Sequence, residues 1–321
     1  MTLKEDIYMI ENIVSIDLFV DEKLEIKRNR LAPPQLNGDE KRICIVTGIH
    51  GDELEGQYVC YQVIKKLKAN LDKLTGIVDV YPALNPLGID SISRNIPMFE
   101  MDMNRIFPGT ENGAVAENIA AKILKNIEGA TMCIDIHSST IYLKEAPQVR
   151  MSEAASEKLL PFSQLLNMDY VWINPKEQIH HATLAHSLNE IGVPTMIVEM
   201  GVGMRITTHY GDILVEGLFR LMKELGIWQG DISSGTTSRI IKDSDIQLVS
   251  ASCSGIFIPR IDHAVNVKKD TPLGDILDTL NGEILETVCS PCDGLILTLR
   301  EYPVVYTGSL LVRLLGGIQY E

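Results

Sequence analysis

Thr47-Gly48-Ile49-His50-Gly51-Asp52-Glu53 lies between an apolar run and a segment with helical periodicity. Residues 43–46 before it are apolar and predict a short buried strand. After it, apolar side chains recur at helical spacing: Tyr58, Val59, Val63, Ile64 and Leu67. The stretch is therefore predicted to be a strand-to-helix corner, from which His50 and Glu53 project at the carboxyl edge of a sheet. An imidazole and a carboxylate are a donor pair that suits zinc, and a catalytic zinc takes three protein ligands and keeps a fourth position for water.

The best candidate for the third ligand is His137. It lies in Cys133-Ile134-Asp135-Ile136-His137-Ser138-Ser139, where a second apolar run ends in polar residues. Active sites of open α/β sheets lie outside the carboxyl ends of the strands, so both corners are expected at the same edge. The His-x-x-Glu spacing taken alone also fits a solvated helix start, which is the competing interpretation.

Composition limits the class of protein. The chain has 321 residues, 45% of them hydrophobic and 22% charged, which is typical of a soluble globular protein with room for two domains. The net charge of -14 argues against a nucleic-acid partner, because phosphate binding needs clustered Lys and Arg. A small-molecule substrate fits better. The first residues lack a signal-peptide pattern and no apolar run approaches a membrane span, so we expect a cytoplasmic protein without a membrane partner. The sequence leaves the subunit number open, including assembly as a homo-oligomer.

The cysteines do not predict a structural zinc site. Cys44, Cys60 and Cys133 lie inside apolar segments and are expected to be small core residues. Cys289 and Cys292 form a Cys-x-x-Cys pair, but no second Cys or His pair lies near them in the sequence, so they are interpreted as strand and turn residues.

Strand and helix patterns alternate through the first 225 residues. Such alternation predicts an α/β fold with a mixed, largely parallel sheet and helices on both faces. Edge strands are expected within residues 7–30, and a long loop from Asn85 to Gly109, which by its length is expected to be functional. Further strands are expected at 43–46, 77–81, 132–136, 170–173 and 195–198, and helices after 54 and at 115–127, 153–166, 183–190 and 213–225.

The composition changes near residues 229–238, which read as a linker. The prediction is a catalytic domain over residues 1–235, including the edge strands, and a small all-β, barrel-like domain over 236–321. The second part resembles biotinyl/lipoyl carrier domains, but the region matching their modified lysine reads Asp278-Thr279-Leu280-Asn281-Gly282. Without that lysine, we expect this part to cap the active-site mouth or to mediate oligomer contacts.

Several motifs occur in a fixed order along the chain. They are His50-x-x-Glu53, Ser93-Arg94-Asn95, Asp102-Met103-Asn104-Arg105, Asp135-Ile136-His137 and Ile197-Val198-Glu199-Met200-Gly201. In this order they resemble the succinylglutamate desuccinylase/aspartoacylase family of zinc carboxypeptidase-like deacylases, over about residues 35–225. The resemblance implies that one zinc ion per chain is held by His50, Glu53 and His137. It further implies that Glu199 is the general base and then acid, that Arg94 stabilises the oxyanion, and that Asn104 and Arg105 bind a substrate carboxylate.

The chemistry of these residues agrees with the implied roles. A carboxylate at the end of an apolar strand, as Glu199 is, can pass a proton from water to a leaving nitrogen, although a solvated strand end is the alternative. Asp135 shares a strand face with His137 and either orients that ring through its other nitrogen or simply points to the site. Asn104 and Arg105 could equally be ordinary loop residues, and Arg150 is a further candidate for substrate binding. The other histidines lack ligand spacing and are expected to be structural or exposed: His180, His181, His186, His209 and His263.

The sequence thus predicts a zinc-dependent amidohydrolase that cleaves the amide bond of an N-acyl amino acid or a similar small N-acyl amine. The first alternative is a zinc carboxypeptidase that acts on small peptides. The second, of a different class, is an inactive module that binds a small carboxylate.

Overall fold

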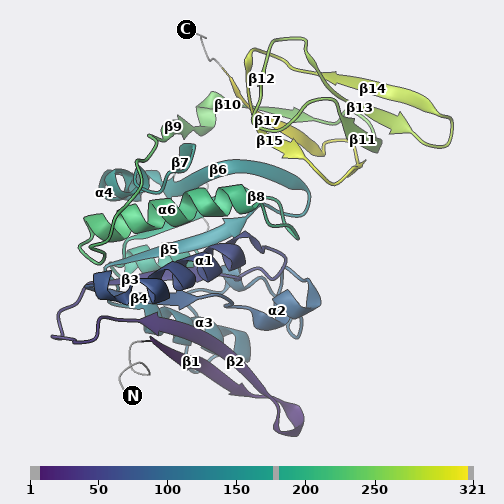
Figure 1. Ribbon diagram of the computed structural model, residues 1–321. Coiled ribbons are helices and arrows are strands. Elements are labelled where there is room, and N and C mark those ends of the chain that lie inside the picture. Colours follow the sequence, from purple (N-terminus) through teal and green to yellow (C-terminus); the bar gives the residue numbers. More distant parts are fainter. Residues whose placement is uncertain (1–7, 176–180, 317–321) are drawn as a thin grey trace.

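The computed structural model describes residues 8–175 and 181–316, and its core is one large sheet (Figure 1). Thirteen strands of the described residues form this sheet in the order β1-β2-β4-β3-β5-β8-β6-β15-β17-β10, with β7 paired to β6, β9 to β7 and β12 to β15. In chain order they are β1 (Tyr8–Asp17), β2 (Lys23–Leu31), β3 (Arg42–Thr47), β4 (Ile77–Tyr81), β5 (Met132–Ser138), β6 (Leu143–Ser152), β7 (Tyr170–Asn174), β8 (Thr195–Gly201), β9 (Arg239–Lys242), β10 (Ile246–Ser250), β12 (Asn266–Val267), β15 (Gly294–Arg300) and β17 (Leu310–Gly316).

The centre of the sheet is parallel and its flanks are largely antiparallel. Strands β4, β3, β5 and β8 run parallel to one another, whereas β1, β2 and β6 pair antiparallel to their neighbours in the sheet order. The central strands are apolar because both of their faces are covered. The predicted mixed α/β class is confirmed, but the sheet is not largely parallel as predicted: within the described residues, parallel pairing is confined to β4-β3-β5-β8 and to the branch β6-β7-β9.

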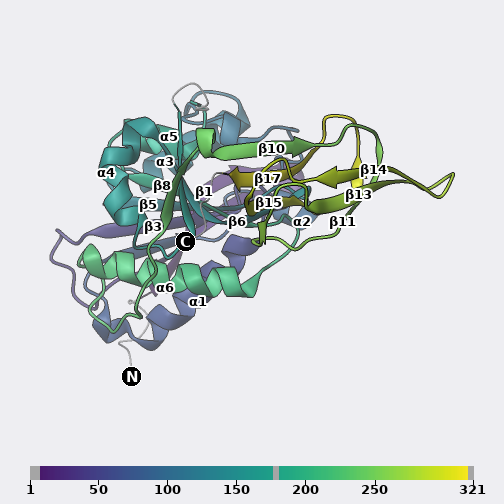
Figure 2. The ribbon, with the colours of Figure 1, turned by 90° about the horizontal axis from the view of Figure 1, so that it is seen from above.

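Helices cover both faces of the central strands. Figure 2 shows α1 (Glu55–Ala69) and α6 (Thr208–Glu224) on one side, and α3 (Val115–Ile127) and α5 (Leu184–Glu190) on the other. The side chains of α1 and α6 share one hydrophobic cluster with alternate residues of the strands, and those of α3 and α5 share a second. Helix α4 (Glu153–Ser163) packs against β6 and β7. Each of these helices was predicted, although α6 begins five residues before the expected position 213.

Two segments differ from the sequence prediction. The long loop expected between residues 85 and 109 contains a short helix, α2 (Pro86–Ser91), and a 3-10 turn, η3 (Met103–Arg105). Strand β6 was not predicted at all. Its sequence, Leu-Lys-Glu-Ala-Pro-Gln-Val-Arg-Met-Ser, carries charged residues and a proline, which are unusual for a central strand.

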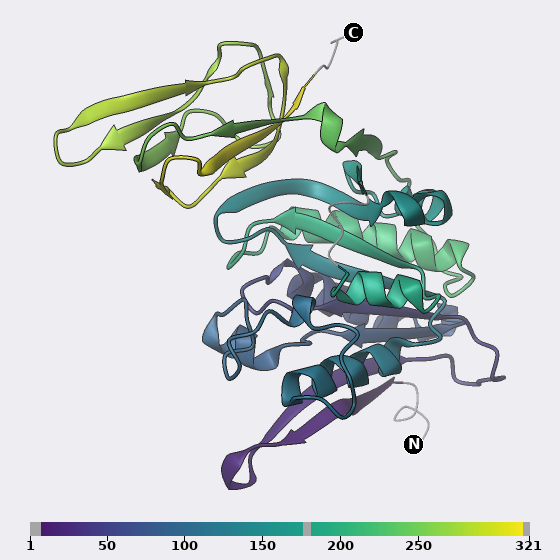
Figure 3. The ribbon, with the colours of Figure 1, turned by 180° about the vertical axis from the view of Figure 1, so that it is seen from behind.

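The C-terminal part is β-rich, as predicted, and hydrogen-bonds to the main sheet. Strand β15 pairs with β6, and β9 pairs with β7, so pairing crosses the predicted domain boundary at residue 235. A second sheet has the order β14-β13-β11-β16, formed by β11 (Gly255–Pro259), β13 (Pro272–Asp278), β14 (Glu283–Cys289) and β16 (Val304–Val305). The hairpin of β13 and β14 extends away from the helices (Figure 3), and its turn holds the residues expected in place of a carrier lysine.

Other sequence expectations concern the cysteines and membrane spans. Cys44, Cys60 and Cys133 are buried as expected, and Cys289 ends strand β14. Within the described ranges, none of the helices combines the length and the apolar character that crossing a bilayer requires.

Candidate functional site

The turn between β3 and α1 places His50 and Glu53 at the carboxyl edge of the parallel strands. The backbone N–H of Gly51 donates to the carbonyl of Ser93, at 3.0 Å, which ties the turn to the segment after α2. A Cβ on Gly51 would lie 1.9 Å from the carbonyl carbon of Gly88, so only glycine permits this approach. His50 and Glu53 are consequently buried at 3% and 4% exposure.

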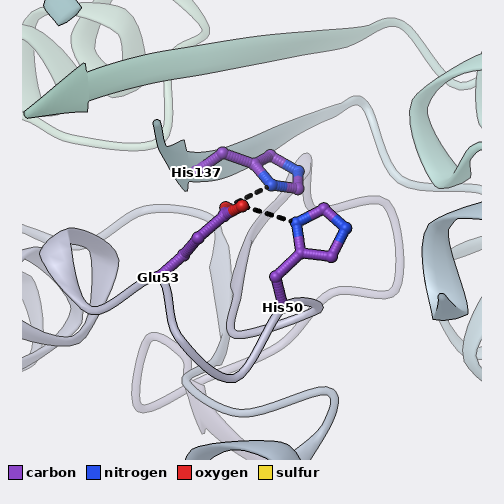
Figure 4. Close-up of side chains that lie close together, drawn as sticks. All are labelled: His50, Glu53 and His137. Carbon is purple, nitrogen blue, oxygen red and sulfur yellow. Dashed lines mark hydrogen bonds and ion pairs between the residues drawn. The ribbon is translucent and has the colours of Figure 1, made fainter. Parts of the chain in front are cut away.

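His50, Glu53 and His137 converge on one point (Figure 4). The Nδ1 of His50 lies 2.7 Å from Oε1 of Glu53, and the Nδ1 of His137 lies 2.9 Å from Oε2. The two ring centroids are 5.1 Å apart. One ligand atom from each residue lies within 4.8 Å of the others, and this is the one such group among the described residues.

This donor set fits a metal ion. His50 Nδ1 is buried and makes no hydrogen bond, although Oε1 of Glu53 lies 2.7 Å away. The opposite nitrogen of each ring lies beside another carboxylate: Nε2 of His50 hydrogen-bonds to Oδ1 of Asp102 at 3.1 Å, and Nε2 of His137 lies 3.1 Å from Oδ1 of Asp135 without forming a hydrogen bond to it. Carboxylates behind ligand histidines fix the ring orientation and the tautomer that presents a lone pair to a metal.

The electrostatics of the site follow from this crowding of rings and carboxylates. Burial lowers the pKa of His50, but Asp102 and Glu53 outweigh burial and the net shift is upward. The pKa of His137 is likewise raised, since Asp135 and Glu53 outweigh its burial. Burial raises the pKa of Glu53, but the two histidines outweigh it and lower that pKa overall. Glu53 is therefore an ionised donor.

Glu199 lies on β8 directly beside His137 of β5 in the strand register. Its side chain faces the same side of the sheet as that of Ile197, which lines the same cavity. Oε1 of Glu199 is 3.9 Å from Nη1 of Arg150 on β6. Burial raises the pKa of Glu199, and Arg150 offsets part of that rise.

The segment after α2 supplies the remaining predicted residues. Arg94 donates through Nη1 to Oε1 of Glu53, at 2.9 Å, and its Nη2 lies 3.4 Å from Asp102. Asn104 accepts from the backbone N–H of Leu184 at 2.9 Å, so its side chain also holds the start of α5. Arg105 donates to the carbonyl of Asn104 at 2.7 Å.

These residues surround a cavity of about 670 Å³, a size that suits a small-molecule ligand. All predicted site residues except Asp135, which lies behind His137, line it: His50, Glu53, Arg94, Asn104, Arg105, His137, Arg150 and Glu199. The structure brings the predicted residues together, while their roles stay predictions.

Three residues of the site carried no role in the sequence prediction. Asp102 contacts His50, and the Asp-x-Asn-Arg motif in which it lies was its only local signal. Glu145 on β6 and Arg313 on β17 also line the cavity. Their position follows from strand pairings between distant parts of the chain, which no local pattern reveals.

The other histidines lie outside the donor set. His181 and His186 contact each other, with 3.2 Å between ring nitrogens, and His186 also lines the cavity. His263 is held by the carbonyl of Leu297 at 3.1 Å, and His209 is exposed. His180 is outside the described residues.

The fold and the site together define a class: a mixed α/β protein whose strand ends carry the His2Glu donor set found in catalytic zinc sites of the carboxypeptidase A type. The family model of the succinylglutamate desuccinylase/aspartoacylase catalytic domain matches residues 39–225. This match covers more than half of the sequence, so the chain belongs to that family, as its motifs predicted.

Among curated proteins, the N-alpha-acetyl-L-2,4-diaminobutyric acid deacetylase of Halomonas elongata is 30% identical over 104 residues. That match spans 32% of this chain and 29% of the deacetylase.

Solved structures share the fold over nearly the whole length. The product-bound ectoine utilization protein EutE (DoeB) from Ruegeria pomeroyi has a TM-score of 0.82 at 20% identity, covering 98% of this chain and 97% of that one. A succinylglutamate desuccinylase/aspartoacylase from Rhodobacter sphaeroides has a TM-score of 0.80 at 19% identity, covering 100% and 98%.

Proposed function

We propose that this chain is a zinc-dependent amidohydrolase that removes the acyl group from the nitrogen of an amino acid or a similar small amine. The observation that carries the proposal is the convergence of His50, Glu53 and His137 beside Glu199 on the wall of one cavity. Membership of a deacylase family supports it, as does the partial match to a deacetylase.

His50 and His137 would hold the ion through Nδ1, and Glu53 through its carboxylate. Two imidazoles and one carboxylate favour zinc among the common divalent ions. When bound there, zinc polarises the acyl carbonyl and lowers the pKa of a bound water towards about 7.

The chain's own residues then carry the proton and the charges. Glu199, next to His137 in the sheet, takes the proton of the attacking water and delivers it to the nitrogen that leaves as the amine. Arg94, which already neutralises Glu53 at 2.9 Å, supplies a fixed positive charge where the oxyanion develops. Arg105 and Arg150 line the cavity and present guanidinium groups to a substrate carboxylate, with Asn104 beside them.

The deciding experiment is a turnover screen of zinc-loaded protein with N-acetyl, N-succinyl and other N-acyl amino acids, with dipeptides as the comparison. We expect release of the free amine from at least one N-acyl substrate, faster than hydrolysis of any dipeptide. Bound zinc should approach about one ion per chain.

The variant Glu199→Gln tests the mechanism, because it removes the base and leaves the three ligands in place. We expect it to keep its zinc while losing at least about a hundredfold in kcat. Glu157→Gln on the exposed face of α4, outside the cavity, is the matched control and should retain full activity. Full activity of Glu199→Gln would remove the mechanism.

A further inference from the structure

Glu145 is a buried carboxylate in the cavity wall that the proposed mechanism does not use. It lies on β6, in register with Thr298 of β15, and its exposure is 2%. A buried carboxylate needs positive charge and hydrogen-bond donors, since its desolvation costs several kcal/mol in their absence. The groups that meet this need come from two distant parts of the chain.

Each oxygen of Glu145 has two neighbouring donors. Oε2 accepts from Nε2 of Gln148 at 2.8 Å and from the hydroxyl of Thr298 at 2.9 Å. Oε1 accepts from Nη1 of Arg313 at 2.5 Å, and Nη2 of Arg150 lies farther away, at 3.5 Å. Arg313 and Thr298 belong to the C-terminal strands, so that region supplies the nearest donor to Oε1 and one of the two donors to Oε2.

Arg150 is held between two carboxylates without a close bond to either. Its guanidinium nitrogens lie 3.5 Å from Glu145 and 3.9 Å from Glu199, both longer than a charge-assisted hydrogen bond of about 2.8 Å. The ring of Trp172 lies under the guanidinium carbon, 5.1 Å from the ring centroid, and Nε of Arg150 is buried without a partner. Because both carboxylate distances are long, the terminal nitrogens Nη1 and Nη2 keep donors for an incoming anion.

Arg313 and Arg150 compete for the same oxygen of Glu145. Because Arg313 occupies Oε1 at 2.5 Å, Arg150 stays at the longer distance and remains in the cavity wall beside Glu199. Without Arg313, Arg150 would be the nearest cation to a buried carboxylate, and charge neutralisation would draw it toward Glu145 and away from the cavity.

We propose that Arg313 is a positioning residue: by occupying Glu145, it keeps the Arg150 guanidinium free to bind a carboxylate on the amine portion of the substrate. The preferred substrates are then N-acyl amines that carry a free carboxylate. This inference rests on the proposed function, and it makes the C-terminal strands part of the substrate site.

Kinetics with a matched pair of substrates test the proposal. The pair is the best N-acyl amino acid from the screen and the same compound with its carboxylate converted to a carboxamide. In Arg313→Met we expect KM for the acid to rise at least about tenfold, the loss typical of a weakened hydrogen bond between charged groups, while KM for the carboxamide changes by less than about twofold. Because this role concerns binding of the carboxylate, the loss for the acid relative to the carboxamide should lie in KM, and any change in kcat caused by moving Arg150 away from Glu199 should be the same for both substrates. Arg313→Lys keeps a cation near Glu145 and should raise KM for the acid less than Arg313→Met does.

The double variant Arg313→Met/Glu145→Gln separates positioning from direct binding. Removing the charge of Glu145 releases Arg150 again, so we expect KM for the acid to return to within about threefold of the wild-type value. Arg260→Met is the matched control: it breaks an Arg–carboxylate pair with Asp275, at 2.6 Å, in the C-terminal sheet outside the cavity, and should leave both KM values unchanged.

Three results would overturn the inference. The first is an equal rise in KM for the acid and the carboxamide in Arg313→Met. The second is a double variant whose KM for the acid stays as high as that of Arg313→Met. The third is a crystal structure of Arg313→Met in which Arg150 remains about 3.5 Å from Glu145. The expected structure shows that distance contracted to about 2.8 Å. If the zinc-loaded wild type cleaves no N-acyl amine, the proposed function fails, and the crystal structure alone still decides whether Arg313 positions Arg150.

Discussion

Asp102 lies behind His50, and Asp135 lies behind His137. Removing either carboxylate should weaken metal binding, and the size of the loss should differ between the two. Nε2 of His50 lies 3.1 Å from Asp102, and Nε2 of His137 lies 3.1 Å from Asp135. With the carboxylate gone, neither ring orientation nor tautomer is fixed, and part of the population presents a protonated Nδ1 to the ion. The variants Asp102→Ala and Asp135→Ala impose this change on one ring at a time.

The expected magnitudes follow from exposure. Loss of such a carboxylate costs about 10- to 100-fold in metal affinity, or about 1.4 to 2.7 kcal/mol. The Asp102 side chain is 20% exposed, so water can replace part of its contact, whereas Asp135 is 0% exposed. We therefore expect about tenfold weaker zinc binding for Asp102→Ala and a loss closer to a hundredfold for Asp135→Ala.

The assay is competition for zinc against a chromophoric chelator, which gives Kd for each variant. Asp212→Asn, whose carboxylate bonds Tyr58 at an exposed position, is the control and should bind zinc as the wild type does. Wild-type affinity in both alanine variants would refute the idea that these carboxylates orient the ligands. A larger loss for Asp102→Ala than for Asp135→Ala would refute the argument from exposure.

Three further predictions concern metal removal, the turn and the core. Dialysis against a chelator should abolish turnover and lower the melting temperature. The reason is that an ion whose free concentration is about 1,000 times its Kd stabilises the fold by about 4 kcal/mol. An unchanged melting curve would contradict this prediction. Gly51→Ala should reduce zinc affinity, measured by the same competition, since its Cβ would meet the Gly88 backbone at 1.9 Å and displace His50. Asp79→Ala should cost about 3 to 5 kcal/mol in urea unfolding, because Asp79 is fully buried and pairs with Arg28, Arg30 and Arg42; a loss below 1 kcal/mol would count against that pairing.

The central architecture was predictable because its signals are local. Strand β5 begins with an apolar run and helix α3 has apolar residues at helical spacing, and both were located to within two residues. The candidate ligands His50, Glu53 and His137 follow from the same logic, because parallel strands end at one edge of the sheet. These predictions needed only the period of the pattern and the residues at its end.

The rest of the site could not be read in this way. Glu145, Arg150 and Ser152 of strand β6 are polar and line the cavity, so the sequence of β6 does not resemble that of a buried strand. Its partner β15 is reached through the pairing of Glu145 with Thr298, across more than 150 positions of sequence. The proposed role of Arg313 depends on that pairing, so no pattern within a short segment of the sequence predicts it.

The position of β6 has a practical consequence for anyone who wishes to divide this protein. Cutting the chain after residue 235 would strip β9 from β7 and β15 from β6, leaving two unpaired edges in the middle of the sheet. The fragment would also expose a carboxylate that had been neutralised from outside the fragment. If a shortened protein aggregates or loses its selectivity, the cause would therefore be the lost strand pairing within the sheet rather than the loss of a separate accessory domain.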